Sequence, residues 1–198
     1  MDKTYYPNGV LESDMLYRHG KLDGRSVWYY EHGKKRMEID YVSGKKNGVM
    51  YRYFRNGNLE FLQYFKNDAM EGISEEYNEK GILICKLHYK NGVKNGKYFE
   101  YYDDGALRIE GEYSRDMYDG IWKYYDEEGF SIGEAAFSDG SGTLKIYDAN
   151  ENLIRTVPYT RNAINGDVID YDKNGKIEKV SAYDMGRFVE IKIMDKNK

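Results

Sequence analysis

Hydrophobic and polar positions recur along this chain with a period of 24 residues. One glycine series occupies positions 9, 33, 57, 81, 105 and 129, and one tyrosine series occupies positions 5, 29, 53, 77, 101 and 125. Within each period, two runs rich in aromatic and β-branched residues, such as 97–102 and 106–114, flank a three-residue link that contains glycine. Such runs predict two strands joined by a hairpin turn. The pattern therefore predicts an all-β fold, an elongated antiparallel meander of about eight β-hairpin repeats in one curled or twisted sheet.

The length of the link determines which side chains share a face, because a slip of one residue inverts a strand. A three-residue link with a bulged glycine predicts three cross-strand pairs: Tyr53 with Leu59, Tyr77 with Leu83, and Tyr101 with Leu107. The same register predicts that Met37, Ile39 and Tyr41 lie on the face of Tyr29.

A second connection follows each hairpin and ends in a turn-forming dipeptide such as Asn47-Gly48. Asp68 and Asp116 replace its first glycine in two repeats, and aspartate is one of the few residues that tolerate a positive φ. We expect a valine at Ser43, just before that glycine, to matter far less than a valine at Gly57 or Gly105, which should cost about 1–3 kcal/mol.

The array is predicted to span residues 1–186, with an irregular part at 138–166. Two residues of the period are missing there, and Asn150-Glu151-Asn152 stands where the link glycine belongs, so this link is expected to be distorted. Residues 187–198 alternate hydrophobic and charged positions and then become polar, which predicts a capping strand and a polar tail.

Composition narrows the classes of function. The mean hydropathy of −0.85 and the 22 tyrosines favour an array in which each unit packs on its neighbours, and they disfavour a compact two-layer core. Residues 1–100 hold 17 Lys and Arg against 14 Asp and Glu, a net charge of +3, and residues 101–198 hold 13 against 20, a net charge of −7. A charge of +3 is too small to indicate nucleic-acid binding. No apolar run approaches the roughly 20 residues that cross a bilayer, so we expect a cytoplasmic protein, or a secreted one if a signal peptide has been removed.

Residues with catalytic or metal-binding chemistry form no recognisable motif, so we expect no enzyme, no cofactor and no metal site. Because Cys85 is the one cysteine of the sequence, an intramolecular disulfide is excluded. The three histidines are not spaced as metal ligands are. The segment 170–177 does match the start of a calcium loop, with oxygen ligands on alternate residues. However, Ser181 replaces the glutamate of position twelve, and Tyr171 and Gly175 already occupy repeat positions. A hairpin link is favoured there, and a weak calcium site is the alternative.

The segments Tyr53-Phe54-Arg55-Asn56-Gly57 and 41–48 (YVSGKKNG) resemble the MORN-repeat-variant family, which includes bacterial proteins labelled as YwqK-type antitoxins. The resemblance covers about residues 5–186. It implies a binding scaffold, with lipid binding claimed for some members, and the antitoxin label implies a toxin as partner.

The function expected from the sequence is therefore a non-enzymatic scaffold that binds a protein or peptide. The candidate partner-binding residues are four tyrosines of the repeated aromatic face: Tyr29, Tyr53, Tyr77 and Tyr101. A structural role for these tyrosines in the core of the array is the first alternative. A membrane-surface role is the second, since four lysines lie in the return connections: Lys21, Lys45, Lys46 and Lys94.

Overall fold

The computed structural model describes residues 2–193, and these residues form strands and turns with no helix. The predicted all-β antiparallel meander of hairpin repeats is confirmed. The chain divides into two compact units: unit 1 comprises Met1–Lys94 and Asp103–Gly105, and unit 2 comprises Asn95–Tyr102 and Ala106–Lys198. The sequence predicts one array over 1–186 and does not anticipate this division.

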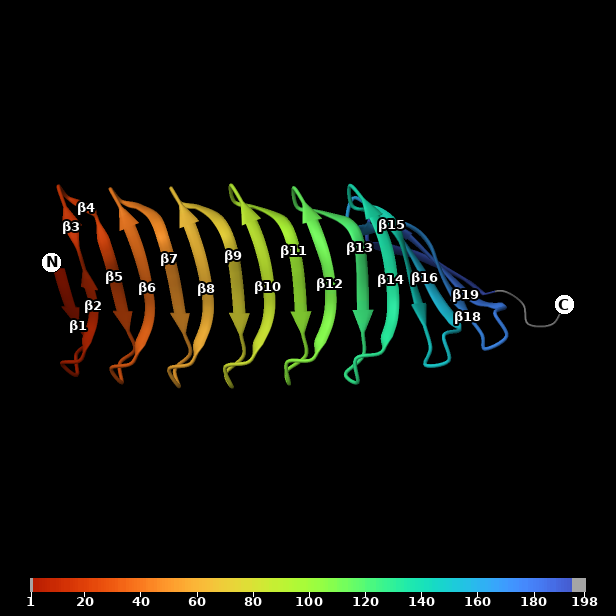
Figure 1. The fold of residues 1–198 in the computed structure, drawn as a ribbon, viewed down its shortest axis with the longest axis horizontal. Coiled ribbons are helices and arrows are strands. Elements are labelled where there is room, and N and C mark those ends of the chain that lie inside the picture. Colours follow the sequence, from red (N-terminus) through yellow and green to blue (C-terminus); the bar gives the residue numbers. More distant parts are fainter. Residues whose placement is uncertain (1, 194–198) are drawn as a thin grey trace. The chain divides into compact units, whose positions relative to one another are not determined.

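Unit 1 is a meander in which successive hairpins lie side by side (Figure 1). Its strands are β1 (Asp2–Tyr5), β2 (Leu11–Met15), β3 (Tyr17–Arg18), β4 (Lys21–Leu22), β5 (Gly24–Tyr29), β6 (Lys35–Val42), β7 (Lys45–Tyr53), β8 (Leu59–Lys66), β9 (Ala69–Tyr77) and β10 (Leu83–Lys90). Each strand pairs antiparallel with the next, except that β2 pairs with β5 and the short β3 and β4 pair with each other.

Unit 2 continues the same repeat. Its strands are β11 (Val93–Tyr101, of which the first two residues belong to unit 1), β12 (Leu107–Ser114), β13 (Met117–Tyr125), β14 (Ser131–Ser138), β15 (Ser141–Tyr147), β16 (Leu153–Thr160), β17 (Ala163–Ile164), β18 (Gly166–Tyr171), β19 (Ile177–Asp184) and β20 (Arg187–Ile193). Here too the pairing is antiparallel between neighbours, and β16 pairs with both β17 and β18. The predicted capping strand of residues 187–194 coincides with β20 up to Ile193, and β20 pairs with β19. Residue 194 and the predicted tail of residues 195–198 lie outside the described residues.

The three-residue links, which we call corners, have the predicted geometry. In the corner of residues 54–58, the N–H of Phe54 donates to the carbonyl of Asn58 and the N–H of Gly57 donates to the carbonyl of Phe54, both at 2.9 Å. Gly57 has a φ of 95°, which a side chain would strain. All three predicted cross-strand pairs are present: Tyr53–Leu59, Tyr77–Leu83 and Tyr101–Leu107.

The corner expected to be distorted is regular. Glu151 takes the glycine position with a φ of 62°, and its N–H donates to the carbonyl of Asp148 at 3.0 Å. The Asp148 carboxylate accepts hydrogen bonds from the backbone N–H groups of Asn150 and Asn152, both at 2.9 Å. These side-chain bonds hold the turn in place of glycine, so the prediction of a distorted corner was wrong.

The second connections are two-residue hairpins, which we call return turns. In the turn of Ser43 and Gly44 both residues have a positive φ, 51° and 86°, which is a type I′ turn. Asp68 and Asp116 lie at 71° and 68°, as predicted for a glycine substitute. The φ of Ser43 contradicts the expectation that valine matters far less there than at a corner glycine, because a β-branched residue is strained at this φ.

A second bulge in every repeat changes which residues share a face. Tyr53 pairs with Leu59 but its neighbour Arg52 pairs with Phe61, so Glu60 is an extra residue. The same extra residue recurs as the second residue of the strand that follows each corner, and we call this irregularity the corner bulge. Beyond the corner bulge, the side chains of the strand therefore lie on the opposite face of the sheet from the one that the pairing with the tyrosine alone would give.

The prediction that Met37, Ile39 and Tyr41 share the face of Tyr29 is therefore wrong. Tyr29 pairs with Lys35, whereas Met37 pairs with Trp28 and Tyr41 with Gly24 on the opposite face. We call the face of Ile39 the core face and the face of Tyr53 the tyrosine face. The two aromatic columns thus lie on opposite sides of the sheet.

The two residues by which the period is shortened in unit 2 correspond to a third bulge of the repeat. In unit 1, Ile39 pairs with Met50 and Tyr41 with Lys46, so residues 47–49 lie opposite a single residue. Between β14 and β15 the ladder runs from Glu134 to Ser138 without any shift. The shortened period has therefore lost a bulge and kept its corner and its return turn.

The core face is filled differently in the two units. In unit 1 a row of paired residues crosses the strands and mixes polar with apolar side chains: Ser26, Ile39, Met50, Gln63, Ser74 and Leu87. In unit 2 six rings form a cluster with centroids 4.6–6.3 Å apart: Tyr98, Tyr113, Tyr118, Trp122, Phe137 and Tyr159. Trp122 is 3% exposed, and a Cβ on Gly111 would lie 2.3 Å from its ring, so glycine is required there.

Candidate partner-binding site

Hydrogen bonds between equivalent positions of successive repeats hold the corners together. The hydroxyl groups of Tyr6 and Tyr30 donate to the carbonyls of Tyr29 and Tyr53, each at 2.7 Å. In unit 2 the Tyr102 hydroxyl donates to the carbonyl of Tyr125 at 2.8 Å. Because these bonds join residues 23 positions apart, each corner is fixed by the next one.

The return turns are joined by backbone hydrogen bonds. The N–H of Gly44 donates to the carbonyl of Leu22 at 2.7 Å, and that of Asp68 donates to the carbonyl of Lys46 at 2.9 Å. With both ends of the hairpins tied, the strands between them present a regular, preorganised surface in each unit.

The four tyrosines predicted to bind a partner lie half-buried on the tyrosine face. The Tyr53 hydroxyl donates to the carboxylate of Glu38 at 2.7 Å, and Glu38 is only 5% exposed. The Tyr77 hydroxyl donates to Glu75 at 2.8 Å. Tyr53 also borders a cavity of about 530 Å³ with Lys34, Lys35 and the corner of residues 56–58.

Burial and the carboxylate partners change the acidity of these phenols. Burial first, and then the hydrogen bond to Glu75, raise the pKa of Tyr77 to about 12. The same two causes, with Glu38 as the acceptor, raise the pKa of Tyr53 well above its usual value. Both hydroxyls thus stay protonated and engaged at neutral pH, as a structural role requires. Partner binding by the four tyrosines stays a prediction.

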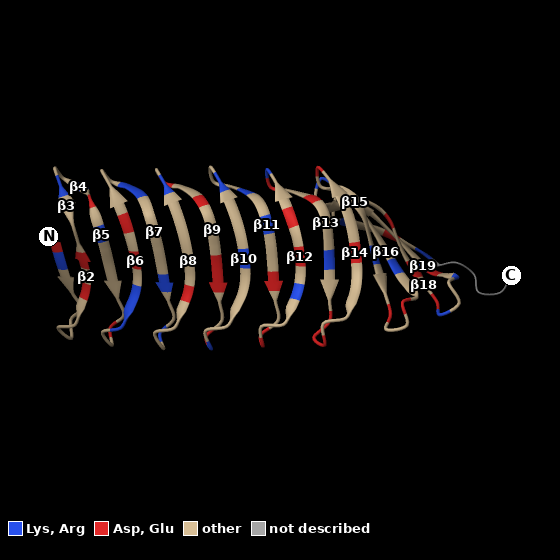
Figure 2. Cartoon of the chain, viewed as in Figure 1, with Lys and Arg blue, Asp and Glu red and all other residues tan. Residues whose placement is uncertain are grey.

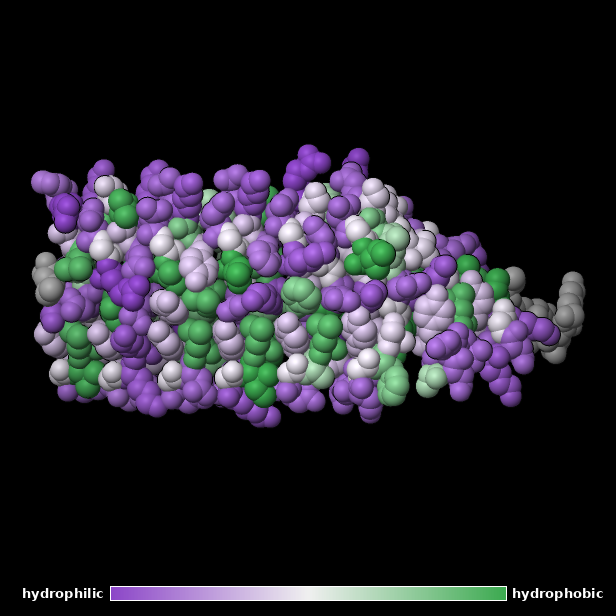
Figure 3. All heavy atoms as spheres, in the orientation of Figure 1, coloured by the Kyte–Doolittle hydropathy of each residue, from purple (hydrophilic) through white to green (hydrophobic). Residues whose placement is uncertain are grey.

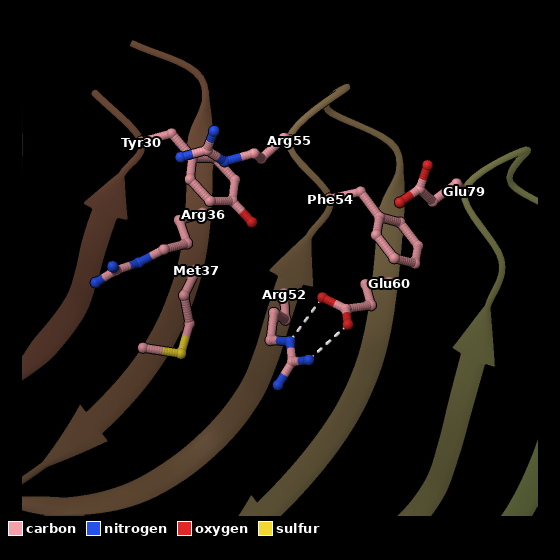
Figure 4. Close-up of a pocket in the computed structure, with 8 residues that line it drawn as sticks. All are labelled: Tyr30, Arg36, Met37, Arg52, Phe54, Arg55, Glu60 and Glu79. Carbon is pink, nitrogen blue, oxygen red and sulfur yellow. Dashed lines mark hydrogen bonds and ion pairs between the residues drawn. The ribbon is translucent and has the colours of Figure 1, made fainter. Parts of the chain in front are cut away.

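A second cavity lies on the other side of the strands in unit 1, at their corner ends (Figure 4). It has a volume of about 570 Å³, within the usual range of ligand sites. We call it the arginine pocket, and its lining residues are Tyr30, Arg36, Met37, Arg52, Phe54, Arg55, Glu60 and Glu79. Tyr30 and Phe54 are corner residues, whereas Arg36 and Glu60 are the extra residues of two corner bulges. The bulges thus place Arg36 and Glu60 at the edge of the pocket, where Figure 4 shows the Arg36 guanidinium extending away from Arg55.

Some charged side chains of the arginine pocket have an oppositely charged partner and others do not. Arg52 donates two hydrogen bonds to Glu60, at 2.5 and 2.6 Å, and this carboxylate raises the pKa of Arg52. The Arg55 guanidinium lies 5.7 Å from the centre of the Tyr30 ring. Across residues 2–193, neither Arg36 nor Arg55 forms an ion pair with a carboxylate.

The apolar part of the arginine pocket comes from Tyr30, Phe54 and Met37. Glu79 lines the pocket at the next corner along the array, so one end is basic and the other carries a negative charge (Figure 4). A ligand with an apolar group flanked by acid on one side fits such a cavity.

The sequence did not predict the arginine pocket. Arg36 and Arg55 lie in the repeat, but the corner bulge that brings Arg36 onto the pocket leaves no trace in hydrophobic periodicity. Figure 2 shows the basic residues near the start of β6, which the net charge of the first hundred residues only hints at.

The calcium-loop segment is a hairpin corner, as favoured from the sequence. The N–H of Asp172 donates to the carbonyl of Lys176 at 2.8 Å, and the N–H of Gly175 donates to the carbonyl of Asp172 at 2.9 Å. Asp170 instead forms an ion pair with Arg155. Within residues 2–193 no group of three or more His, Cys, Asp or Glu side chains is placed to hold a metal ion.

Over the same stretch of chain, no helix is long and apolar enough to cross a membrane. Hydrophobic and polar side chains are interleaved on the surface seen in Figure 3, with no broad apolar band over unit 1.

Comparison with known proteins identifies the repeat. A model of the MORN repeat variant matches residues 3–19, 22–43, 46–67, 70–91 and 94–115, which together are more than half of the chain. The matched segments follow one another with the spacing of the hairpins and stop before the part that lacks the third bulge. No curated protein matches the chain. The chain is a repeat scaffold and belongs to the MORN repeat variant family.

Proposed function

We propose that this protein is a non-enzymatic scaffold that binds an extended segment of a protein partner at the arginine pocket of unit 1. The observation that carries the proposal is the pair Arg36 and Arg55, which lack carboxylate partners among the described residues and flank an aromatic cavity. A guanidinium without a counter-charge binds carboxylates strongly, and aromatic side chains are enriched at binding hot spots.

The preferred ligand is a segment that carries acidic residues next to an aromatic one. The acidic side chains would pair with Arg36 and Arg55, while the ring would pack on Met37 and Phe54. Glu79 at the far end disfavours a ligand that is acidic along its whole length, because like charges repel. The repeated corners on either side give room for an extended segment.

Fluorescence anisotropy with short labelled peptides tests the proposal. We expect an acidic-aromatic peptide to bind, and a peptide with lysine in place of each acid not to bind. Arg36→Glu should weaken binding by about tenfold or more. Arg18→Glu is the matched control, because Arg18 is equally exposed but lies in β3, away from the pocket. Equal affinity for both peptides, or equal loss in both variants, would contradict the proposal.

The resemblance to YwqK-type antitoxins would make the partner a toxin, and the arginine pocket is where we propose such a partner binds. A toxin segment bound there would be displaced by the acidic-aromatic peptide. Cytoplasmic location is part of the same proposal.

A membrane-surface role remains the second candidate. Lys21 and Lys45 are exposed at return turns, where Figure 2 shows basic residues along one end of the hairpins. Co-sedimentation with anionic vesicles at low salt tests it: binding that Lys21→Glu and Lys45→Glu abolish would support this role, and no binding would exclude it.

A further inference from the structure

One corner of unit 2 has the chemistry that the arginine pocket requires. Among the large hydrophobic side chains of residues 2–193, Phe130 is the most exposed, at 71%. It ends the corner of residues 126–130, which reads Asp-Glu-Glu-Gly-Phe. A single exposed hydrophobic side chain is common on protein surfaces, but aromatic residues are enriched at binding hot spots, and this ring stands beside charged groups.

The corner holds Phe130 in a defined position. The Asp126 carboxylate accepts a hydrogen bond from the N–H of Phe130 at 2.8 Å, and the N–H of Asp126 donates to the carbonyl of Phe130 at 3.0 Å. A preorganised aromatic group loses little conformational entropy on binding.

Two acidic side chains stand beside the ring. Glu127 and Glu128 are exposed, and neither takes part in an ion pair within the described part of the chain. Figure 2 shows this corner, between β13 and β14, as a cluster of acidic residues, and the start of β6 in unit 1 as a basic one. The corner thus offers two carboxylates and a ring, and the pocket offers two guanidinium groups and an aromatic lining.

We propose that the corner of residues 126–130 in one copy of this protein binds the arginine pocket of a second copy. The inference rests on the proposed function, since it names the partner of the same pocket. Phe130 would pack on Tyr30, Phe54 and Met37, while Glu127 and Glu128 pair with Arg36 and Arg55.

The contact joins different surfaces of the two copies, so it does not close by itself as a twofold interface does. Such heterologous contacts form rings or open chains of copies. The assembly should therefore grow with protein concentration, and it should shrink at high salt because the charge pairs are exposed and screened.

Sedimentation velocity over a range of concentrations tests the assembly. We expect association at low salt, weakened about tenfold or more by Phe130→Ala. Phe188→Ala is the matched control, because Phe188 is also exposed, at 49%, but lies on β20. A chain that is monomeric at every concentration at low salt would overturn the proposal.

A charge exchange makes the test specific to the two surfaces. One variant carries Arg36→Glu and Arg55→Glu, and the other carries Glu127→Arg and Glu128→Arg. Each variant alone should be monomeric, because its pocket and its corner carry the same charge. An equal mixture should associate again, because each pocket then meets a corner of opposite charge. Failure of the mixture to associate, with both variants folded by circular dichroism, would overturn the pairing.

A synthetic peptide of residues 126–130 separates this inference from the proposed function. Peptide that binds and dissociates the assembly supports both. Peptide that binds a chain which never associates overturns self-recognition and leaves the proposed function standing. If a different acidic-aromatic peptide binds and the 126–130 peptide does not, self-recognition again fails alone. Binding of no acidic-aromatic peptide overturns both.

Discussion

The two units are built from one repeat but differ in what fills the core face. Unit 1 keeps all its bulges, has serine and glutamine in its core row, and leaves a cavity at its corners where Arg36 and Arg55 have no carboxylate partner among residues 2–193. Unit 2 has lost one bulge and holds a six-ring aromatic cluster, and it has a cavity of about 590 Å³ in which Arg155 is paired with Asp170. The difference indicates a division of roles, in which unit 2 supplies a packed core and unit 1 supplies an accessible, charged surface.

The lost bulge and the cluster occur in the same part of unit 2. The Asn162 side chain donates to the carbonyl of Asp116 at 2.7 Å and accepts from the N–H of Tyr118 at 2.8 Å. These two bonds join the return turn that contains Asn162 to the one that contains Asp116, two repeats earlier. This contact adds to the backbone bonds by which return turns in both units are joined to the one before them. The sheet of unit 2 therefore curls onto its own side chains, and these become its core.

The largest expected effect is the loss of the central ring of the cluster. Trp122→Ala removes a side chain that is 3% exposed, and we expect a loss of about 3–5 kcal/mol in unfolding free energy. Met50→Ala, at a half-buried position of the core row in unit 1, should cost less than about 2 kcal/mol. Urea denaturation of both variants measures the difference. Equal losses would contradict the contrast between the units.

Corner strain should come next and should be the same in both units. A Cβ added by Gly9→Val or Gly129→Val meets no atom within 4 Å, so the positive φ of 82° and 86° is the main source of strain. We expect each to cost about 1–3 kcal/mol.

Glu128→Val is the control for corner strain, because Glu128 is exposed and outside the positive-φ residues. It should change the unfolding free energy by less than about 0.5 kcal/mol. Ser43→Val, at a φ of 51°, should cost as much as the corner glycines. A harmless Ser43→Val would show that the return turn is not type I′ in solution.

Removal of one hydroxyl should distinguish phenols that are bonded to a carboxylate, which occur in both units since Tyr125 donates to Glu110 at 2.7 Å, from a phenol that is not. Tyr53→Phe leaves an oxygen of the buried Glu38 carboxylate without its donor, and we expect a loss of about 1–2 kcal/mol. In unit 2, Tyr124→Phe should change the unfolding free energy by less than about 0.5 kcal/mol, because burial first, and then the charges of Tyr159, Tyr118 and Glu100, raise the pKa of Tyr124, with no hydrogen bond among the causes. Thermal unfolding of the pair tests this, and an equal loss in both would show that the Glu38 bond adds nothing.

The smallest expected effect is a loss of stability in alkali. The folded-state pKa of Tyr77 and of Tyr125 is raised from 10.0 to about 12, so the folded state holds these protons more tightly than the unfolded state. Their contribution is complete below pH 10 and should be lost between pH 10 and about 12. Tyr77→Phe should flatten the fall of unfolding free energy over this window. A fall of unchanged slope would contradict the assignment to Tyr77.

The sequence predicts the fold well because glycine and tyrosine recur at fixed positions. The corner register follows from the three-residue link, and the pairs Tyr53–Leu59 and Tyr101–Leu107 confirm it. The faces beyond the corner could not be predicted, because the extra residue Glu60 resembles any polar strand position. The corner at Glu151 was mispredicted for a related reason, since side-chain bonds from Asp148 replace glycine there.

The site was harder to predict than the fold. The tyrosine series stands out in the sequence because every repeat carries it, and Tyr53 and Tyr77 prove to have carboxylate partners. The arginine pocket depends on a combination that the period does not repeat, Arg36 together with Arg55 on neighbouring corners. A periodic pattern emphasises what all repeats share, whereas a specific site depends on what one repeat does differently.

Hydrogen exchange of the whole chain, with and without the peptide of residues 126–130, tests the division of roles most directly. Without peptide we expect the slowest exchange in unit 2, in the strands around Trp122 and Phe137. With peptide we expect slower exchange at the arginine pocket, in residues 30–37 and 52–60, and no change around Trp122. Peptide-dependent protection in unit 2 or at the return turns, with none at the arginine pocket, would contradict the account.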